Sequence, residues 1–163
     1  MDNYFLNYIL HKVPDAFAYI KGSNKYPGIR GIAKFYALDE GIIVYSEVNG
    51  LPFDASTPFR AYAFHIHNGD SCSGNNTDPF LNAGEHYNPD DLPHPYHAGD
   101  LPPLFGNYGY AWNAVFTARF KIYEVIKKPI IIHINPDDFV SQPSGNAGEK
   151  IACGIIERAP IRT

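Results

Sequence analysis

The stretch "GIRGIAKFYALDEGIIVYSEVNGL", residues 28–51, predicts an antiparallel β-hairpin. Two runs rich in isoleucine, valine, tyrosine and phenylalanine, residues 28–38 and 41–51, flank the turn "DEG". Side chains of this kind favour strands, and a short polar turn with glycine joins two neighbouring strands. The stretch therefore indicates a fold built from β-strands.

Similar short runs recur along the chain between turn signals, and we expect strands at residues 15–22, 28–38, 41–51, 59–67, 112–120, 121–126, 129–134 and 150–157. Residues 68–111 and 135–149 are rich in Gly, Asn, Asp and Pro, so we expect two long irregular loops there. Loops of such length in a compact domain usually carry function. About eight short strands with long connections predict an all-β fold, an eight-stranded Greek-key sandwich or barrel.

The composition limits the class of protein. With 163 residues, 45% hydrophobic and 18% charged, the chain predicts one globular domain over residues 1–163. The net charge is −4 and there is no basic run, so nucleic acid is not an expected partner. The first residues, "MDNYFLNYILHKV", lack the features of a signal peptide, and no stretch reaches transmembrane length. We therefore expect a cytoplasmic protein without a membrane partner.

His65 and His67 form an H-x-H pair in the expected strand 59–67. Residues two apart in a strand point to the same face, so both imidazoles can reach one ion. By itself, such a pair is more often two polar side chains that face solvent.

A second group of histidines lies in "HYNPDDLPHPYHAGD", residues 86–100. Three imidazoles and one carboxylate make a complete tetrahedral set for zinc, although the same residues also suit a hydrated loop. His133 ends the apolar run "PIIIH" and would be unremarkable alone, whereas six of the seven histidines fall into three clusters at strand ends or in the long loop. This distribution indicates a metal centre, with the zinc set His86, His94, His97 and Asp100.

Taken together, these residues resemble the copper/zinc superoxide dismutase family. The resemblance covers roughly residues 14–158 and follows the family's order. It is carried by "AFHIH" (63–67), "AGEHYNP" (83–89), "HAGDLPPL" (97–104), "IIIHINPDD" (130–138) and "GNAGEKIACG" (145–154). It implies an eight-stranded Greek-key β-barrel, with copper and zinc as cofactors.

The resemblance also implies the role of each site residue. The copper ligands would be His65, His67, His86 and His133, and the zinc ligands His86, His94, His97 and Asp100. His86 would bridge the two metals, and Asp137 would link a copper-ligand histidine to a zinc-ligand histidine. Cys72 and Cys153 read as free thiols by themselves in a cytosolic chain. The resemblance instead implies a disulfide between them.

The implied activity is the dismutation of superoxide to O₂ and H₂O₂ as copper cycles between two oxidation states. His86 would take part in catalysis by carrying a proton to the product. Lys150 stands where the family has an arginine aimed at the substrate, although it also reads as an ordinary exposed lysine. A homodimer is an assembly that the resemblance allows without defining its interface.

Three departures from the family pattern affect this interpretation. Lys150 keeps the positive charge but lacks the planar fork of arginine, so we expect weaker capture of superoxide. Only two residues separate His94 from His97, and residues 135–149 contain no lysine or arginine that could steer an anion.

Two other functions remain open. One is a metal-binding protein on the same fold with weak or no dismutase activity, which the departures favour. The other is a zinc hydrolase, which is disfavoured because the chain has no H-E-x-x-H motif and a filled four-ligand set leaves no open position.

Overall fold

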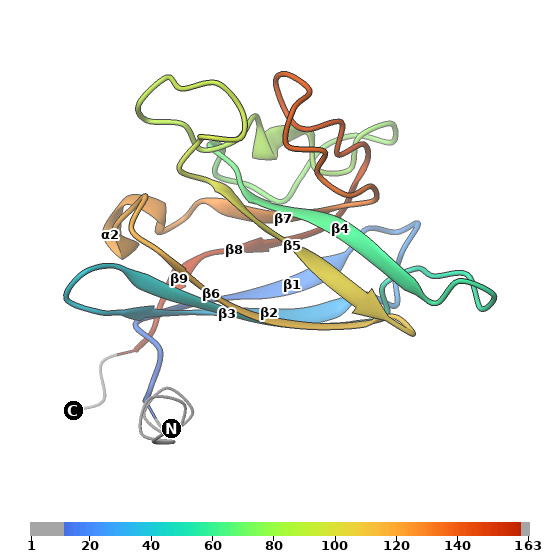
Figure 1. Ribbon diagram of the computed structural model, residues 1–163, viewed down its shortest axis with the longest axis horizontal. Coiled ribbons are helices and arrows are strands. Elements are labelled where there is room, and N and C mark those ends of the chain that lie inside the picture. The colour runs from blue at the N-terminus through green and yellow to red at the C-terminus, as the bar shows by residue number, and fades with distance from the viewer. Residues whose placement is uncertain (1–11, 161–163) are drawn as a thin grey trace.

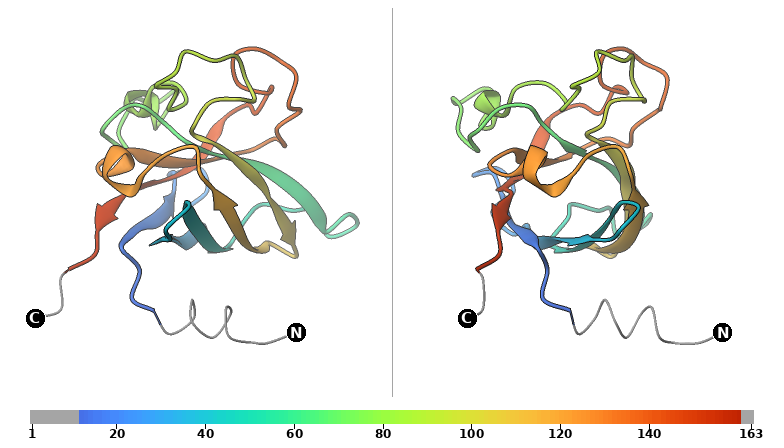
Figure 2. Two further views of the ribbon diagram at one scale, coloured as in Figure 1. Left: turned by 60° about the vertical axis from the view of Figure 1, so that its left-hand side comes forward. Right: turned by 90° about the vertical axis from the view of Figure 1, so that its left-hand side faces the viewer.

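The protein is a closed antiparallel β-barrel, as seen in a computed structural model that describes residues 12–160. Eight strands follow one another around the barrel in the order β2-β3-β6-β5-β4-β7-β8-β1, and β1 pairs with β2 to close it (Figures 1 and 2). The strands are β1 Ala16–Gly22, β2 Arg30–Ala37, β3 Ile42–Asn49, β4 Phe59–Ile66, β5 Asp100–Asn107, β6 Tyr110–Thr117, β7 Pro129–His133 and β8 Lys150–Ile155, with the short β9 Glu157–Arg158 beside β1. The all-β, eight-stranded Greek-key fold expected from the sequence is confirmed.

The barrel interior is filled by alternate residues of each strand. In β4, Tyr62, Phe64 and Ile66 point into the core and are almost fully buried. Phe35 of β2 and Leu104 of β5 meet them from other sides of the barrel. Because successive side chains of a strand face opposite ways, His65 must then lie on the outer surface of the barrel wall.

Two expectations about local structure are wrong. Residues 121–126 were expected to form a strand, but Ile122–Val125 form the one-turn helix α2. The apolar residues at 122, 125 and 126 have helical spacing and pack against the core, and the Glu124 side chain accepts a hydrogen bond from the Lys121 N–H at the start of the helix.

The second error concerns β5, which lies inside the region expected to be irregular. Its sequence "DLPPLFGN" contains Pro102 and Pro103, and prolines weaken a strand prediction. The register with β4 shifts at this point, between the pairs Tyr62↔Leu104 and Phe64↔Leu101. This bulge accommodates two residues that cannot donate a ladder hydrogen bond.

Both long loops lie on the same side of the barrel, above β4 and β7 in Figure 1. One connects β4 to β5 and contains the short 3₁₀ helix η1 Leu81–Ala83; the other connects β7 to β8. Figure 2 shows that the two loops remain neighbours when the molecule is turned. They therefore cover the outer face on which His65 lies.

The first of these loops is attached to the barrel by the disulfide Cys72–Cys153, which confirms the expected pairing. Cys153 is on β8, and the bond packs with Phe80, Ala83 and Ile131 in a small apolar cluster. The two cysteines are 81 residues apart in the chain. A closed loop of that length can stabilise the fold by about 4–5 kcal/mol in the chain-entropy description.

Within residues 12–160, no helix is long and apolar enough to cross a membrane.

Candidate metal centre

The structure gathers all the expected ligands in one buried region between the barrel wall and the two loops. His65 lies on β4, His67 directly follows it, and His133 ends β7. His86, His94 and His97 come from the loop before β5, and Asp100 is the first residue of β5. None of these seven side chains belongs to a residue more than 8% exposed.

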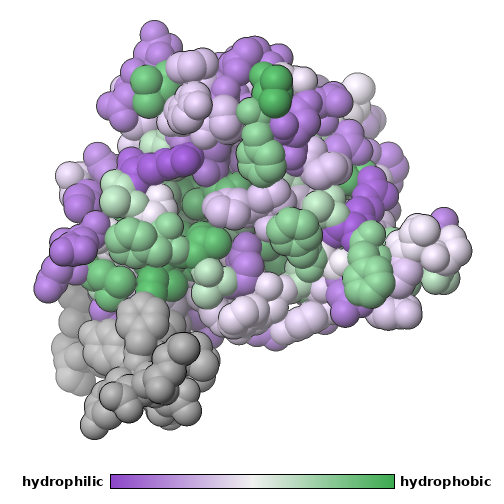
Figure 3. Space-filling model, viewed as in Figure 1, coloured by the Kyte–Doolittle hydropathy of each residue, from purple (hydrophilic) through white to green (hydrophobic). Residues whose placement is uncertain are grey.

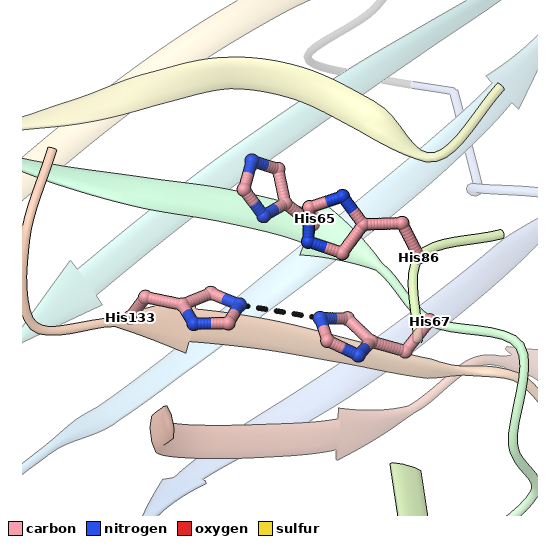
Figure 4. Close-up of side chains that lie close together, drawn as sticks. All are labelled: His65, His67, His86 and His133. Carbon is pink, nitrogen blue, oxygen red and sulfur yellow. Dashed lines mark hydrogen bonds between the residues drawn. The ribbon is translucent and has the colours of Figure 1, made fainter. Parts of the chain in front are cut away.

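The four residues expected to bind copper converge on one point. In His65, His67, His86 and His133, one ring nitrogen from each residue lies within 4.8 Å of those of the others. Figure 4 shows the four imidazoles facing one another, with Nε2 of His67 and Nε2 of His133 3.2 Å apart. The second ring nitrogens of this pair are bound elsewhere: Nδ1 of His67 donates to the Gly84 carbonyl at 2.8 Å and Nδ1 of His133 to that of Gly148 at 3.1 Å.

The residues expected to bind zinc form a second set with the same mutual limit of 4.8 Å: His86, His94, His97 and Asp100. Nδ1 of His86 lies 2.7 Å from Oδ1 of Asp100 and 3.4 Å from Nδ1 of His97. Nδ1 of His94 is 3.0 Å from the other oxygen of Asp100. The short spacing between His94 and His97 therefore still allows both rings to face one carboxylate.

His86 belongs to both sets and presents a different nitrogen to each. Its Nδ1 faces Asp100, while its buried Nε2 has no hydrogen-bond partner. Its ring stacks at a tilt against His65, with centroids 4.1 Å apart. One imidazole thus lies between two four-ligand clusters.

Asp137 connects the two sets by a hydrogen bond to one histidine of each. Its Oδ2 accepts a hydrogen bond from Nε2 of His65 at 2.9 Å, and its Oδ1 accepts one from Nε2 of His94 at 2.9 Å. Burial would raise the pKa of Asp137, but the hydrogen bonds from His65, the Phe139 backbone and His94 outweigh it and lower the pKa to about 2. The carboxylate stays charged and fixes which nitrogen of each ring faces inward.

Burial keeps His65, His67 and His133 of the first set neutral, as metal ligation requires. Burial and then the neighbouring His65 lower the pKa of His133 from 6.5 to about 3. Burial and then His133 lower the pKa of His67 well below 6.5, and burial also lowers the pKa of His65. For Asp100, burial would raise the pKa, but the hydrogen bond to His86 and nearby histidines lower it overall.

The unpaired nitrogens provide a direct test of whether metal ions fit. Among the described residues, three buried ring nitrogens make no hydrogen bond: Nδ1 of His65, Nε2 of His86 and Nδ1 of His94, which lies 3.0 Å from Oδ2 of Asp100 without hydrogen-bond geometry. A buried polar atom without a partner is unfavourable, so a native site normally supplies one. Each of these nitrogens belongs to a ring of one of the converging sets. The other nitrogen of each ring is hydrogen-bonded to Asp137 or lies beside Asp100. Imidazole nitrogens and a carboxylate suit copper and zinc ions.

Sequence analysis missed the residues that hold the two loops together. The side-chain amide of Gln142 donates to the His94 carbonyl at 2.7 Å, and its oxygen accepts the His94 N–H at 3.0 Å. Gly145 has φ +65°, and a Cβ there would lie 2.0 Å from Oδ1 of Asp137. Only glycine permits this close approach without displacing the carboxylate. Neither residue has a sequence signal beyond its place in a turn-rich loop.

Arg119, which follows β6, also supports the second set. Its Nη1 donates to the backbone carbonyls of Pro95 at 3.3 Å, His97 at 3.3 Å and Asp100 at 3.1 Å. One guanidinium nitrogen thus spans the segment that carries two of the expected zinc ligands.

A pocket open to solvent leads to the first set, and His67, His86, His133 and Lys150 are among the residues that line it. Lys150 begins β8 beside His133 and is the expected cation of the site. Its ammonium forms an ion pair with Oδ2 of Asp78, in the loop that carries the disulfide. Asp78 was not expected at the site because nothing in its sequence context indicates it.

The pKa shifts predict how the metal-free protein responds to acid. Because His133 and His67 have lower pKa values folded than unfolded, the unfolded chain binds more protons below pH 6.5. The free energy of unfolding should therefore fall as the pH drops from about 6.5 toward 3, and the lowered pKa of Asp137 extends the loss toward pH 2. Urea unfolding in the presence of a chelator at a series of pH values measures this. A midpoint that is the same at pH 7 and pH 4 would contradict it, and His133→Gln should flatten the profile.

The Arg119 contacts predict an effect on the second set alone. Arg119→Gln removes a charged donor that holds three carbonyls, so zinc affinity should fall by about ten- to a hundredfold, as for other groups that orient metal ligands. Competition with a chromophoric chelator measures the affinity. Arg60→Gln is the matched control, because Arg60 donates to the Ile134 carbonyl and not to this segment. Equal zinc affinity of the wild type and Arg119→Gln would refute the support role.

Comparisons with known proteins agree with this geometry. The sequence profile of the family described as copper/zinc superoxide dismutase (SODC) matches residues 29–156. "Superoxide dismutase [Cu-Zn] 2" of Aquifex aeolicus is 31% identical over 77% of this chain and 78% of its own length. "Superoxide dismutase [Cu-Zn]" of Escherichia coli is 33% identical over 72% of this chain and 78% of its own.

A solved structure, a superoxide dismutase-like protein from Bacillus subtilis, aligns with a TM-score of 0.70 and 26% identity. The alignment covers 85% of this chain and 96% of that one. The barrel, the two clusters of histidines, the disulfide and the profile match lead to one conclusion: the chain belongs to the copper/zinc superoxide dismutase family.

Proposed function

We propose that the protein is a superoxide dismutase, which converts two superoxide ions and two protons to O₂ and H₂O₂. The observation that carries the proposal is His86, which lies between two buried ligand sets and offers one nitrogen to each. We assign copper to the set that opens into the pocket, formed by His65, His67, His86 and His133, and zinc to the set His86, His94, His97 and Asp100.

Copper, when bound, supplies the one-electron redox chemistry that zinc lacks. The protein itself orients the imidazole rings of the ligands and provides a nitrogen that can hold a proton. The Gly84 and Gly148 carbonyls orient His67 and His133, so that Nε2 of each faces the centre. Nε2 of His86 has no hydrogen-bond partner and its residue lines the pocket, so this nitrogen would be placed to hold a proton and pass it to a bound anion whenever it does not ligate copper.

Lys150 is proposed to attract the anionic substrate to the pocket. Its ammonium is the cation among the lining residues that the structure describes for this pocket. A positive group beside an open position raises the local concentration of a small anion. The ion pair with Asp78 holds the ammonium in place and offsets part of its charge. Lys150 is therefore expected to be less effective than a free cation.

The second candidate is a copper- and zinc-binding protein of the same fold with weak or no dismutase activity. The partial neutralisation of Lys150 by Asp78 favours it. The family also includes relatives that are named differently: "Superoxide dismutase-like protein YojM" of Bacillus subtilis is 32% identical over 72% of this chain and 64% of its own length.

We also propose the cytoplasm as the compartment and a homodimer as the assembly. Residues 1–11, from which the sequence interpretation expected this compartment, lie outside the described residues. Fractionation of the producing cells tests the compartment. The disulfide persists most readily in an oxidising compartment, so the protein recovered from the cytoplasm should be checked for free thiols.

The activity proposal predicts that protein loaded with copper and zinc suppresses the reduction of cytochrome c by enzymatically generated superoxide. Metal content must be measured on the same sample, so that inactive protein is not simply empty protein. The control is a solution of free copper at the same concentration that contains no protein. Fully loaded protein that does not suppress the reduction would refute the dismutase and leave the metal-binding protein.

The role of Lys150 predicts opposite effects for the two members of the ion pair. Lys150→Met should lower kcat/KM for superoxide by roughly two- to tenfold because the attracting charge is removed, and Asp78→Asn should raise it because the ammonium is no longer offset. Pulse radiolysis at low and high salt measures both effects. Lys121→Met is the control, since it makes the same charge change before α2, away from the pocket. A decrease with Asp78→Asn would mean that the pair serves only to hold the loop.

A further inference from the structure

A pocket away from the metal centre lies at the barrel end that carries α2 and the turn between β2 and β3. Its volume is about 520 Å³, within the range of about 300–1,000 Å³ that small-molecule sites occupy. Four segments form it: the residues before β1, the β2–β3 turn, the start of α2 and the residues at β9. We call it the α2 pocket. Among the described residues, it shares no lining side chain with the pocket of the metal centre.

Most of the lining of the α2 pocket is apolar. Ile42 of β3 is 2% exposed and belongs to the barrel core, and Ile122 of α2 packs against that core. Leu38 is partly buried, while Tyr123 is 69% exposed and can stack its ring on an aromatic ligand. Figure 3 shows hydrophobic side chains gathered at the left of the molecule, where Figure 1 places α2 and the β2–β3 turn. Such a lining favours a ligand with an apolar body.

Hydrogen bonds hold the walls of the α2 pocket in place without a ligand. The Leu38 N–H donates to the Gly41 carbonyl at 2.8 Å, which closes the β2–β3 turn. The Asp15 N–H donates to the Phe35 carbonyl at 2.8 Å, and the Asp15 carbonyl accepts the Ala159 N–H at 3.0 Å. These bonds tie the segment before β1 to β2 and to the residues after β9. Because the walls are already ordered, a ligand need not order the chain around it.

The charged residues of the lining favour an anion. Lys121, at the start of α2, and Arg158 of β9 both line the pocket. Neither cation forms an ion pair with another described residue. The one carboxylate among the described lining residues is that of Asp15. Its Oδ2 accepts the Ala37 N–H at 2.8 Å and lies 3.4 Å from the Lys12 ammonium, so its charge is partly offset.

Other acidic side chains near these segments do not line the α2 pocket. Asp39 and Glu40 of the β2–β3 turn are exposed. The Glu124 carboxylate accepts the backbone N–H of Lys121, and Glu157 lines a different hollow on the other side of β9. None of the four is among the described lining residues of the α2 pocket. The two cations therefore remain available to a bound anion.

We propose that the α2 pocket binds a small organic anion of the aromatic carboxylate class. Its ring would lie against Leu38, Ile42 and Ile122, and its carboxylate would pair with Lys121 and Arg158. The combination of apolar lining and two cations distinguishes such a ligand from a neutral aromatic molecule and from an inorganic anion. The site is separate from the metal centre, so the proposal does not depend on dismutase activity.

The probe that tests the proposal is 2-naphthoate, compared with its neutral analogue 2-naphthalenemethanol. Each is titrated into the full-length protein loaded with zinc, and the amide signals are followed by NMR, which gives both affinity and location. We expect 2-naphthoate to shift the amides of Leu38, Ile122 and Ala159 and to leave those of His67 and His133 unshifted. It should bind about tenfold more tightly than the alcohol, because two exposed charges each contribute modestly.

The double variant Lys121→Gln/Arg158→Gln removes both cations. It should weaken the binding of 2-naphthoate by about tenfold and leave that of the alcohol unchanged. The matched control is Arg30→Gln/Lys34→Gln, which removes one arginine and one lysine of β2 that do not line the α2 pocket. This control should bind 2-naphthoate like the wild type. Circular dichroism and urea unfolding show whether both double variants fold.

Three results would overturn the proposal. The first is that no amide of the α2 pocket shifts at about 1 mM 2-naphthoate. The second is equal affinity for 2-naphthoate and the alcohol, or equal affinity of the wild type and Lys121→Gln/Arg158→Gln for 2-naphthoate. The third is a set of shifts confined to the surroundings of His67 and His133, which would place the anion at the metal centre instead.

Discussion

The metal centre depends on the carboxylate of Asp137. One oxygen binds His65 from the barrel wall and the other binds His94 from the loop before β5, each at 2.9 Å. These hydrogen bonds occupy the outer nitrogen of each ring and leave the inner nitrogen for an ion. The low pKa of Asp137 keeps the carboxylate charged across the physiological range. Because it binds one histidine of each set, it couples the two sets mechanically.

This arrangement requires two long loops to be held against the barrel wall, and the structure uses several attachments to do so. The disulfide Cys72–Cys153 ties the first loop to β8. Gln142 joins the second loop to His94, and Arg119 holds the segment around His97 from the end of β6. Each attachment fixes the backbone near a ligand. These contacts, and not only the ligand side chains, therefore set the positions of the ligand atoms. Pre-ordered ligands lose less entropy when an ion binds.

The residues at the entrance of the pocket bear on which of the two proposed functions applies, enzyme or metal-binding protein. The two ligand sets match those that the resemblance to the dismutase family implies, while the ammonium of Lys150 is paired with Asp78 and residues 135–149 contain no lysine or arginine. A capture site with partly offset charge lowers the rate of encounter with an anion without altering the ligands. The proposed dismutase activity would therefore depend in part on how far Asp78 offsets the charge of Lys150.

The sequence by itself determined the all-β class, the H-x-H pair on one strand face and, through the family motifs, the grouping of His86 with both sets. These features follow from local patterns: side chains alternate along a strand, and motif residues keep their order. The sequence interpretation missed β5 because its prolines weaken a strand prediction, and it took residues 121–126 for a strand although their apolar residues have helical spacing.

Only the tertiary structure decided which residues support the ligands. Asp78, Arg119, Gln142 and Gly145 act through contacts with residues far away in the chain, and such contacts leave no local pattern. The edge-to-face contact of Tyr45 on β3 with Trp112 on β6 is another such feature, because it exists only once the strand register places the two residues side by side. Sequence reveals the chemistry of side chains, while folding decides which of them meet.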